Sequence, residues 1–594
     1  MTFHHPPQAD RRLDLASVLA DLTADGFLDR GTANQILGQN RSREQSAMHP
    51  LVYIAGQQLE NRLQPGRKLD AETLTRWLAE KSGLPVWHID PLRVNVPAVT
   101  AVMSYEFARR HQILCLAADR DRVVIATAQP FATGWVEGLE QATRKPIERV
   151  VANPADVEKY TVEFYTLSRS VMGAGRAQMG TSRPALTNVE QLFEVGGLQD
   201  PDAQDQHIVN IVDWLLQYAF DQRASDIHLE PRRDKGRIRF RIDGVLHQVY
   251  ELPPQVMTAM VSRLKILARM NVAEKRKPQD GRVKTKSPDG DEVELRLSTL
   301  PTAFGEKLVM RIFDPEVLLR SFGDLGLTGG DHERWQSMTS RSHGIVLVTG
   351  PTGSGKTTTL YSTLKYLATE AVNVSTVEDP IEMVEAAFNQ TQVNPAIDFD
   401  FAAGIRTLMR QDPDIIMVGE IRDLATAEMA TQAALTGHLV LSTLHTNDAP
   451  TAITRLLDLG VPGHLIRVTL NGVMAQRLVR VLCPQCKERT TVDPDVWQEL
   501  VSPWQAAAPS HVYQPVGCLD CRNTGYLGRI GLYEIMVIGD SLRALVNDQC
   551  DTAQLRLRAM KEGMRTLRLN GAQKVAAGVT SVEEVLRVTP QHEH

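Results

Sequence analysis

The sequence predicts an α/β protein whose central part is a parallel sheet built around a phosphate-binding loop. Apolar strands alternate with helices between residues 344 and 477, a pattern typical of a parallel sheet covered on both faces. One of these strands, GIVLVT, runs directly into the glycine-rich segment GPTGSGKT at 350–357, which opens a helix. The region at 203–320 differs, because strand-like segments there surround two amphipathic helices, and this predicts a separate α+β domain.

The chain has 594 residues, which predicts several domains rather than one. A stretch rich in Gly, Ala, Ser and Thr after residue 166 is typical of a flexible linker. The predicted parts are an N-terminal α/β domain at 1–165, a flexible linker at 166–202, a second α+β domain at 203–320, the phosphate-loop domain at 321–477, a four-cysteine module at 478–530 and a helical C-terminal part at 531–594.

Composition narrows the class of protein. The net charge is -6 and the pI is about 6.3, which argues against a general nucleic-acid binder because such proteins usually carry a basic surplus. No apolar run approaches the roughly 18 residues that a membrane span needs. The first residues, MTFHHPPQAD, lack the pattern of a signal peptide. We therefore expect a cytoplasmic protein without a membrane span or a nucleic-acid partner.

The segment at 350–357 fits the spacing of an ATP-binding loop that also holds Mg²⁺. Glycines let the backbone approach phosphate with its N–H groups pointing inward, and the helix that follows adds positive charge at its N-terminus. Lys356 is expected to reach the β- and γ-phosphates, and the hydroxyl of Thr357 to bind Mg²⁺. The predicted ATP- and Mg-binding residues are Gly350, Pro351, Thr352, Gly353, Ser354, Gly355, Lys356, Thr357 and Thr358.

Acidic residues follow two other predicted strands. Glu420 ends the strand segment IIMVGE, where Gly419 occupies the place usually held by an Asp. Glu378, Asp379 and Glu382 follow a second strand in VEDPIE. A carboxylate near the loop can orient the magnesium or its water, and another can act as general base toward the attacking water, so Glu378, Glu382 and Glu420 are catalytic candidates. The alternative is that these carboxylates cap a turn or are solvated.

Two histidines, His438 and His445, flank the predicted strand in HLVLSTLH. A histidine at a strand end close to phosphate can sense the γ-phosphate or bridge to a neighbour, so both are further candidates for the site. The alternative is that each is a structural residue with its hydrogen bonds satisfied.

Four segments, GPTGSGKTTTLY, TVEDPIE, RQDPDIIMVGEIRD and LTGHLVLSTLHTNDA, occur in this order and spacing, and together they resemble the type II secretion and type IV pilus assembly ATPases. The resemblance covers about 203 to 594. It implies a RecA-like P-loop NTPase core whose four segments are the Walker A, Asp box, Walker B and His box. It also implies that Glu382 is the water-activating carboxylate, that Glu420 lies near magnesium, and that His438 and His445 form the His box.

Residues 223 to 311 resemble the second N-terminal domain of the same family, a PAS-like α+β domain. The matching stretches are RASDIHLEP, IRFRIDG, EKRKPQDGR and LSTLPTAFGEKLVMR. An arginine from another domain or subunit can neutralise the charge of phosphoryl transfer, so Arg239, Arg241 and Arg276 are candidate arginine sensors acting in trans. About half of the arginines here are expected to serve structural salt bridges instead. Lys277 departs from the family, which usually has an apolar residue there.

Cysteines form two Cys-x-x-Cys pairs, Cys483/Cys486 and Cys518/Cys521, separated by 31 intervening residues. Four thiolates suit a closed, structural Zn²⁺ site, and the reducing compartment favours metal over disulfides. The alternative is four unliganded thiols. The flanking segments LCPQCK and GYLGRIGLYEIM resemble the zinc-binding insertion of the same family.

Residues 72 to 165 loosely resemble the first N-terminal domain of this family, through LAEKSGLP and ATAQP. In relatives this domain is an adaptor for an inner-membrane partner, and in some it binds cyclic di-GMP. The nearest match to the nucleotide-binding opening is Arg12-Leu13-Asp14, and the spacing after it does not fit. We therefore do not predict cyclic di-GMP binding.

The resemblance implies a homo-hexameric motor that hydrolyses ATP to assemble a pilus or pseudopilus, attached to the inner membrane through platform and cytoplasmic-domain proteins. The zinc module and the long N-terminal region resemble extension or secretion ATPases rather than retraction ATPases. Two other functions stay open at this point. One is a nucleic-acid-dependent RecA-like motor, which the acidic balance disfavours. The other is a nucleotide-binding scaffold without hydrolysis, which the carboxylates disfavour.

Overall fold

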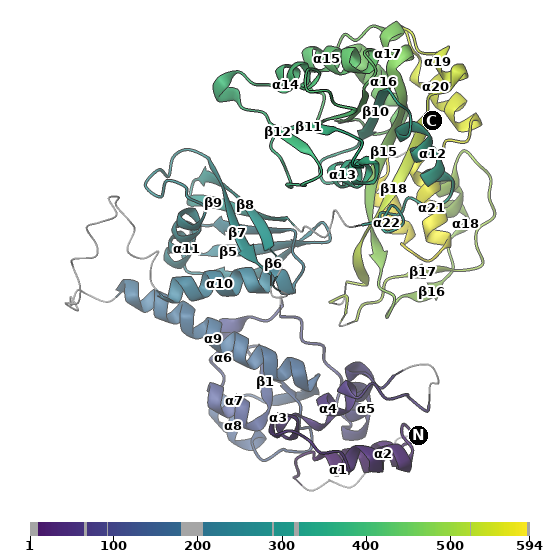
Figure 1. Cartoon of the computed structure of the whole chain (residues 1–594). Coiled ribbons are helices and arrows are strands. Elements are labelled where there is room, and N and C mark those ends of the chain that lie inside the picture. The colour runs from purple at the N-terminus through teal and green to yellow at the C-terminus, as the bar shows by residue number, and fades with distance from the viewer. Residues whose placement is uncertain are drawn as a thin grey trace. The chain divides into compact units, whose positions relative to one another are not determined.

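A computed structural model shows two compact units, Met1–Ile312 and Phe313–His594 (Figure 1). It describes residues 10–63, 68–91, 93–179, 206–287, 290, 292–313, 320–518, 520–522 and 524–590. Within these ranges, every helix is too short or too polar to cross a bilayer.

The first unit begins with a small helical layer. Aspartate side chains cap three of its helices, because each accepts a hydrogen bond from a first-turn N–H group. The apolar faces enclose a core that includes Leu19, Ile54 and Leu78. The helices are α1 (Leu15–Ala24), α2 (Arg30–Leu37), α3 (Arg43–Ala47), α4 (Pro50–Gly56) and α5 (Ala71–Ser82).

A three-stranded sheet follows, with strand order β1-β2-β3 and all five residues of β2 buried. Its elements are α6 (Val96–Thr100), α7 (Tyr105–His111), β1 (Ile113–Ala118), β2 (Val123–Thr127), α8 (Val136–Thr143), β3 (Ile147–Val151) and α9 (Pro154–Met179). The helix α9 corrects one expectation: residues 166–179 are helical, although their composition predicts a flexible linker. Small residues such as Ala are compatible with a helix. The rest of that predicted linker, 180–202, lies outside the described residues.

The first unit ends in a six-stranded antiparallel-rich sheet of order β6-β5-β4-β9-β8-β7. The strand β5 alternates buried and partly buried residues, so one face carries apolar side chains and the other carries arginines. The helix α10 packs on α9 and α11, and α11 contacts β4. The elements are α10 (Gln206–Asp221), β4 (Asp226–Pro231), β5 (Gly236–Ile242), β6 (Val245–Leu252), α11 (Pro254–Leu267), β7 (Gln279–Lys286), β8 (Glu292–Thr302) and β9 (Gly305–Phe313). This matches the predicted α+β region.

The second unit contains a seven-stranded sheet of order β12-β11-β13-β14-β10-β15-β18. Six strands are parallel, but β18 runs antiparallel to β15, so the sheet is mixed and not purely parallel as predicted. Its strands are β10 (Gly344–Thr349), β11 (Val374–Glu378), β12 (Asn389–Gln392), β13 (Ile415–Val418), β14 (Leu439–Leu444), β15 (Leu470–Leu482) and β18 (Tyr526–Val537). The long β15/β18 pair continues past the sheet into the cysteine module.

Helices cover both faces of this sheet and enclose two cores. Strands β10, β11, β13 and β14 are buried along their whole length, as predicted for the strands of a parallel sheet. The helices are α12 (Gly330–Thr339), α13 (Lys356–Leu367), α14 (Phe401–Leu408), α15 (Leu424–Leu435), α16 (Ala449–Asp458) and α17 (Gly463–Thr469).

The cysteine module and the C-terminal helices complete the second unit. The module contains β16 (Glu488–Thr490), α18 (Pro494–Val501) and β17 (Val512–Gln514), and the chain ends in α19 (Asp540–Arg543), α20 (Thr552–Lys561), α21 (Leu567–Ala576) and α22 (Val582–Val588). The predicted boundaries at 478 and 530 fall inside β15 and β18. The C-terminal part is therefore helical only beyond Val537.

Candidate functional site

The glycine-rich loop lies at the carboxyl end of β10, between that strand and α13. Gly350 has φ +149°, and a Cβ there would lie 2.5 Å from the carbonyl oxygen of Gln476. Gly355 has φ +85° and begins α13 without any side-chain cap, so the first-turn N–H groups of α13 remain available to an anion. The backbone of this loop is therefore shaped to wrap phosphate, as the motif predicts.

The side chains of the loop are arranged to meet a ligand. Lys356 is 9% exposed, and its Nζ donates to the carbonyl oxygens of Gly350 (2.8 Å) and Pro351 (3.2 Å). Burial lowers the pKa of Lys356, while the carboxylates of Glu420 and Glu382 act in the opposite direction. The other predicted contacts share the loop and the start of α13: Thr352 and Gly353 are exposed, Thr357 and Thr358 are partly buried, and the buried Ser354 hydroxyl has no hydrogen-bond partner among the described residues.

Glu378, one of the three carboxylate candidates, is buried at the end of β11. Its carboxylate accepts hydrogen bonds from the hydroxyls of Tyr361 (2.7 Å) and Thr376 (2.7 Å) and from the amide of Gln390 (3.1 Å). Both oxygens of Glu378 are therefore hydrogen-bonded within the protein. Burial is the main cause of the raised pKa of Tyr361, and the charge of Glu378 adds to it. The structure thus places Glu378 in the packing of α13 on β11.

Glu420 follows β13 and faces two cationic or titratable partners. It forms an ion pair with Arg422, which also contacts Asp379 at 3.4 Å, and its second oxygen lies 3.3 Å from Nε2 of His445. The hydrogen bond to Glu420 raises the pKa of Arg422. Arg422 therefore links the ends of β11 and β13, a role that the sequence did not single out.

Glu382 is partly buried in the segment after β11. Its charge raises the pKa of Tyr361 and opposes the effect of burial on the pKa of Lys356. Among the three carboxylate candidates, the charges of Glu382 and Glu420 act on Lys356, whereas Glu378 is buried at the end of β11.

The structure separates the two histidines that the sequence paired. His445 follows β14 at the carboxyl edge of the sheet, on the side of the phosphate loop. His438 precedes β14, and its Nδ1 lies 2.9 Å from the carbonyl oxygen of Ala433 at the end of α15. Because β10 and β14 are parallel, His438 stands at the opposite edge from the loop. Within one chain, His438 therefore lies away from the loop, and its role in the site stays a prediction.

A polar layer beneath the loop joins it to the neighbouring strands, and sequence reasoning missed it. The hydroxyls of Thr349 and Thr446 lie 2.7 Å apart, and Thr359 donates to the side chain of Gln476 at 2.9 Å. Arg477, which is 6% exposed, donates to Asn447 and to the carbonyl oxygen of Gln476, and burial lowers its pKa. The signal was weak because these residues sit on β15 and after β14, far apart in sequence.

The three candidate arginines lie in the first unit and differ in their surroundings. Arg239 donates to Glu230 at 2.6 Å, and Arg241 contacts Asp226 at 3.7 Å and the carbonyl oxygen of Gly244 at 2.9 Å. Arg276 lies in the loop before β7 with 90% of its side chain exposed. The expectation that part of this cluster serves structural ion pairs is met by Arg239 and Arg241.

The four cysteines of the module come together although the two pairs are distant in sequence. Their sulfurs all lie within 4.8 Å of one another, with Cys483–Cys518 at 3.6 Å and Cys486–Cys521 at 3.7 Å. Four sulfurs about 2.3 Å from a tetrahedral metal are separated by about 3.8 Å, so the spacing fits one ion. Backbone N–H groups of Gly517 and Gly525 point at these sulfurs from 3.2 Å, which suits thiolates. The cluster can therefore hold a metal.

A glycine loop that opens a helix, a buried lysine inside it and two carboxylates at neighbouring strand ends define the class of P-loop nucleoside triphosphatases. More narrowly, the chain belongs to the Type II/IV secretion system protein family, whose model matches residues 202–587. A second model, the MshEN domain, matches residues 82–171 and confirms the resemblance of the N-terminal region.

Relatives agree with this family. The chain is 54% identical over 591 residues to the type IV pilus assembly ATPase TfpB of Acinetobacter baylyi, covering 99% of this chain and 100% of that protein. It is 41% identical over 488 residues to the type II secretion system protein E of Pseudomonas aeruginosa, covering 82% and 96%. Among solved structures, the ATPase DotB of Legionella pneumophila is 21% identical, with a TM-score of 0.48, 64% of this chain and 95% of that chain covered.

Proposed function

We propose that this chain is a Mg²⁺-dependent ATPase that works as a homo-hexamer to assemble a type IV pilus or the pseudopilus of type II secretion. The observation that supports it best is the loop at 350–357, where Lys356 and an uncapped helix start meet the charges of Glu382 and Glu420. Fixed positive groups next to two carboxylates suit phosphoryl transfer, which proceeds mainly by positioning and charge stabilisation.

Each residue has one role in the proposed reaction. Glu382 accepts a proton from water as the water oxygen forms a bond to the γ-phosphorus; the bond to the bridging oxygen breaks, and its electron pair leaves with ADP. Lys356 and the loop N–H groups stabilise the charge on the phosphate oxygens. Thr357 and Glu420 would hold Mg²⁺, which supplies further neutralisation of the phosphates. His445 orients Glu420 through their contact of 3.3 Å.

The hexamer and its partners rest on family relationship. In the proposed ring, the PAS-like domain of one copy supplies arginines to the nucleotide of another, and hydrolysis moves the two units against each other. The MshEN-like region is the proposed adaptor for inner-membrane platform and cytoplasmic-domain proteins, which would hold the ATPase at the cytoplasmic face of the membrane. The 54% identity to one pilus assembly ATPase favours a pilus; another pilus assembly ATPase is 39% identical, and a type II secretion ATPase is 44% identical.

Phosphate release tests the enzymatic proposal. Full-length protein with ATP and Mg²⁺ is expected to release phosphate, and EDTA or the substitution Lys356→Ala is expected to abolish the release. Added DNA should leave the rate unchanged, because the basic surplus of a nucleic-acid motor is missing. Release that needs DNA would favour the RecA-like nucleic-acid motor, and release equal in wild type and Lys356→Ala would contradict the proposal.

For the cysteine cluster we propose a structural Zn²⁺. The four sulfurs close the coordination shell, so the ion would hold the base of the β15/β18 pair together rather than act on substrate. Metal analysis of purified protein should give one zinc per chain, and Cys518→Ser should lose it. The matched control is Cys115→Ser, which changes a buried cysteine of β1 outside the cluster and should retain the zinc. Equal zinc content in the two variants would contradict this assignment.

A further inference from the structure

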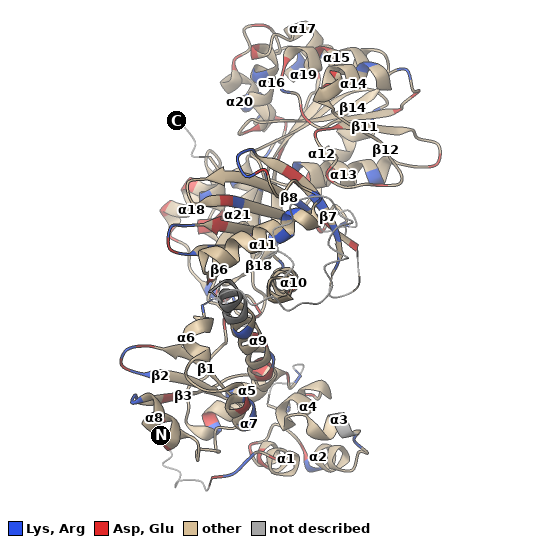
Figure 2. Cartoon of the chain, turned by 90° about the vertical axis from the view of Figure 1, so that its left-hand side faces the viewer, with Lys and Arg blue, Asp and Glu red and all other residues tan. Residues whose placement is uncertain are grey.

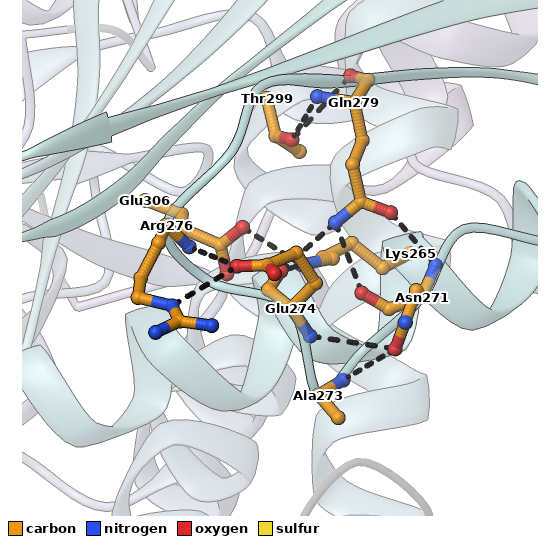
Figure 3. A network of polar contacts seen from close by, with 8 residues as sticks. All are labelled: Lys265, Asn271, Ala273, Glu274, Arg276, Gln279, Thr299 and Glu306. Atoms are coloured by element: carbon orange, nitrogen blue, oxygen red, sulfur yellow. Dashed lines mark hydrogen bonds and ion pairs between the residues drawn. The ribbon is translucent and has the colours of Figure 1, made fainter.

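A completely buried lysine in the first unit is used to fix a surface loop. Lys265, on α11, has a side-chain exposure of 0%. Its Nζ donates to the carboxylate of Glu306 at 2.7 Å and to the carbonyl oxygen of Glu274 at 2.7 Å (Figure 3). Burying an ammonium group is unfavourable unless it is paired and hydrogen-bonded, so both contacts are needed. One of them fixes main chain in the loop between α11 and β7.

The same loop is held from its other side by an amide side chain. Gln279, the first residue of β7, donates to the carbonyl oxygens of Glu274 (2.9 Å) and Asn271 (3.0 Å) and accepts from the N–H of Asn271 at 2.8 Å. The Asn271 side chain accepts from the N–H groups of Ala273 and Glu274. Figure 3 shows Lys265 of α11 and Gln279 of β7 both bonded to Glu274. The carbonyl oxygen of Glu274 thus accepts from two buried or partly buried donors.

What this loop carries is an exposed cation. The carboxylate of Glu274 accepts a hydrogen bond of 2.7 Å from the N–H of Arg276, and that bond is the main reason why the pKa of Glu274 is lowered. The guanidinium of Arg276 keeps only a long contact of 3.5 Å with Glu274, and 90% of its side chain is exposed. The backbone is fixed while the charged end projects from it.

Such an arrangement suits a group that must reach charge outside its own domain. An unrestrained loop would lose conformational entropy each time its arginine engaged a phosphate, whereas a pre-ordered loop avoids that loss. Arg239 already donates to Glu230 at 2.6 Å and Arg241 to the carbonyl oxygen of Gly244 at 2.9 Å, and their side chains are only 32% and 37% exposed. Arg276 is therefore the candidate arginine that the structure both orders and leaves open.

We propose that Lys265 is a positioning residue for ATP hydrolysis: it fixes the loop at 271–279 so that Arg276 is presented to the triphosphate bound by a neighbouring copy. This inference rests on the proposed ATPase function and adds a residue to it. Lys265 acts through Arg276 and does not touch the nucleotide.

A double-mutant cycle tests the inference on the full-length, assembled protein with Mg-ATP. We expect Arg276→Ala to lower kcat by about 100-fold and Lys265→Met by roughly tenfold, with KM little changed because the phosphate loop is intact. The double variant should be no slower than Arg276→Ala alone, since Lys265 has no role once its arginine is gone. The control Lys284→Ala removes an exposed cation of β7 outside the network and should keep kcat within about twofold.

Other outcomes separate the possible failures. The inference is overturned if the fold-losses in kcat of the two single variants multiply in the double variant. It is also overturned if Lys265→Met changes only the thermal stability or KM. If Lys265→Met does not fold, Gln279→Leu releases the same loop from β7 and must show the same non-additivity with Arg276→Ala. If Arg276→Ala hydrolyses ATP as fast as wild type, only the inference is refuted. If wild type hydrolyses ATP no faster than Lys356→Ala, the proposed function is refuted.

Discussion

Two regions of the molecule carry charged side chains but pair them differently. They are the phosphate-loop edge of the second unit and the charged face that β4 and β5 form in the first unit. At the phosphate-loop edge, Lys356 donates to main-chain carbonyls and the start of α13 is uncapped. On the sheet face, Glu230 contacts Arg232, Arg239 and Lys307, and its side chain is 4% exposed.

In this chain, ligand-binding groups and structural ion pairs can be distinguished by what the charged side chains contact. A charged side chain that is paired with a buried side chain of opposite charge stabilises its own unit, because buried charge must be neutralised locally. Donors with unused capacity at a shaped backbone are available to a ligand. By this criterion Lys356 and Arg276 are ligand-facing, and Arg239 is structural. Figure 2 shows further Lys and Arg residues along β7 and β8. Exposure alone would not distinguish a ligand-binding cation from a structural one there.

The largest effect on stability is expected from Glu230→Gln, on the β4/β5 face. Removing this carboxylate charge leaves Arg239 and Lys307 without their buried partner, so the first unit should be destabilised by about 3 kcal/mol. Thermal unfolding of the full chain should show an earlier transition, with the transition of the second unit unmoved. An unchanged unfolding profile would mean that the β4/β5 face is not neutralised internally.

A pH-dependent effect of intermediate size is expected at Glu584, which is buried on α22. Burial alone would raise its pKa, but hydrogen bonds and charge from Arg480 and Arg587 lower it to about 2. Because the pKa of Glu584 is lower in the folded state, its ionised carboxylate stabilises the protein at pH values above the unfolded-state pKa of about 4.3. This stabilisation is lost as the pH falls toward 2. Glu584→Gln should therefore cost about 2 kcal/mol at neutral pH.

The control for this prediction is the same comparison in acid. Melting temperatures of wild type and Glu584→Gln should converge between pH 4.3 and pH 2, in the window just given. A constant difference across that window would show that Glu584 is not held as a carboxylate by the two arginines.

The smallest effect is expected from Tyr361→Phe, which sharpens the contrast between Glu378 and Glu382. Loss of the hydroxyl removes one of three donors to Glu378 and should destabilise the second unit by about 1 kcal/mol. Turnover with Mg-ATP should stay within about twofold, because Glu378 does not face the ligand. A large loss of kcat with unchanged stability would place Glu378 among the reacting groups.

Local motifs predicted the parts of the site that depend on adjacent residues. The loop at 350–357 is one contiguous segment, and each Cys-x-x-Cys pair is another, so the chemistry of each can be predicted from its residue spacing. The surroundings of Glu378 and His438 were not predicted, because they depend on which end of a strand faces the loop and on partners such as Tyr361. The layer of Gln476 and Arg477, and the antiparallel β18, arise from long-range pairing that periodicity does not encode.

The fold followed the same rule. Buried strands β10, β11, β13 and β14 were predicted as apolar runs, and α10 as an amphipathic helix. The extension of α9 to Met179 was missed because a sequence rich in small residues has little apolar periodicity, although such residues form helices readily.

The most direct test of the account compares Glu382→Gln with Glu378→Gln in the assembled protein at saturating Mg-ATP. We predict that Glu382→Gln still binds nucleotide but releases phosphate about 100-fold more slowly, while Glu378→Gln keeps kcat within about threefold. A fast Glu382→Gln beside a slow Glu378→Gln would contradict it, because the carboxylate that the structure buries against Tyr361 would then be the one that activates water.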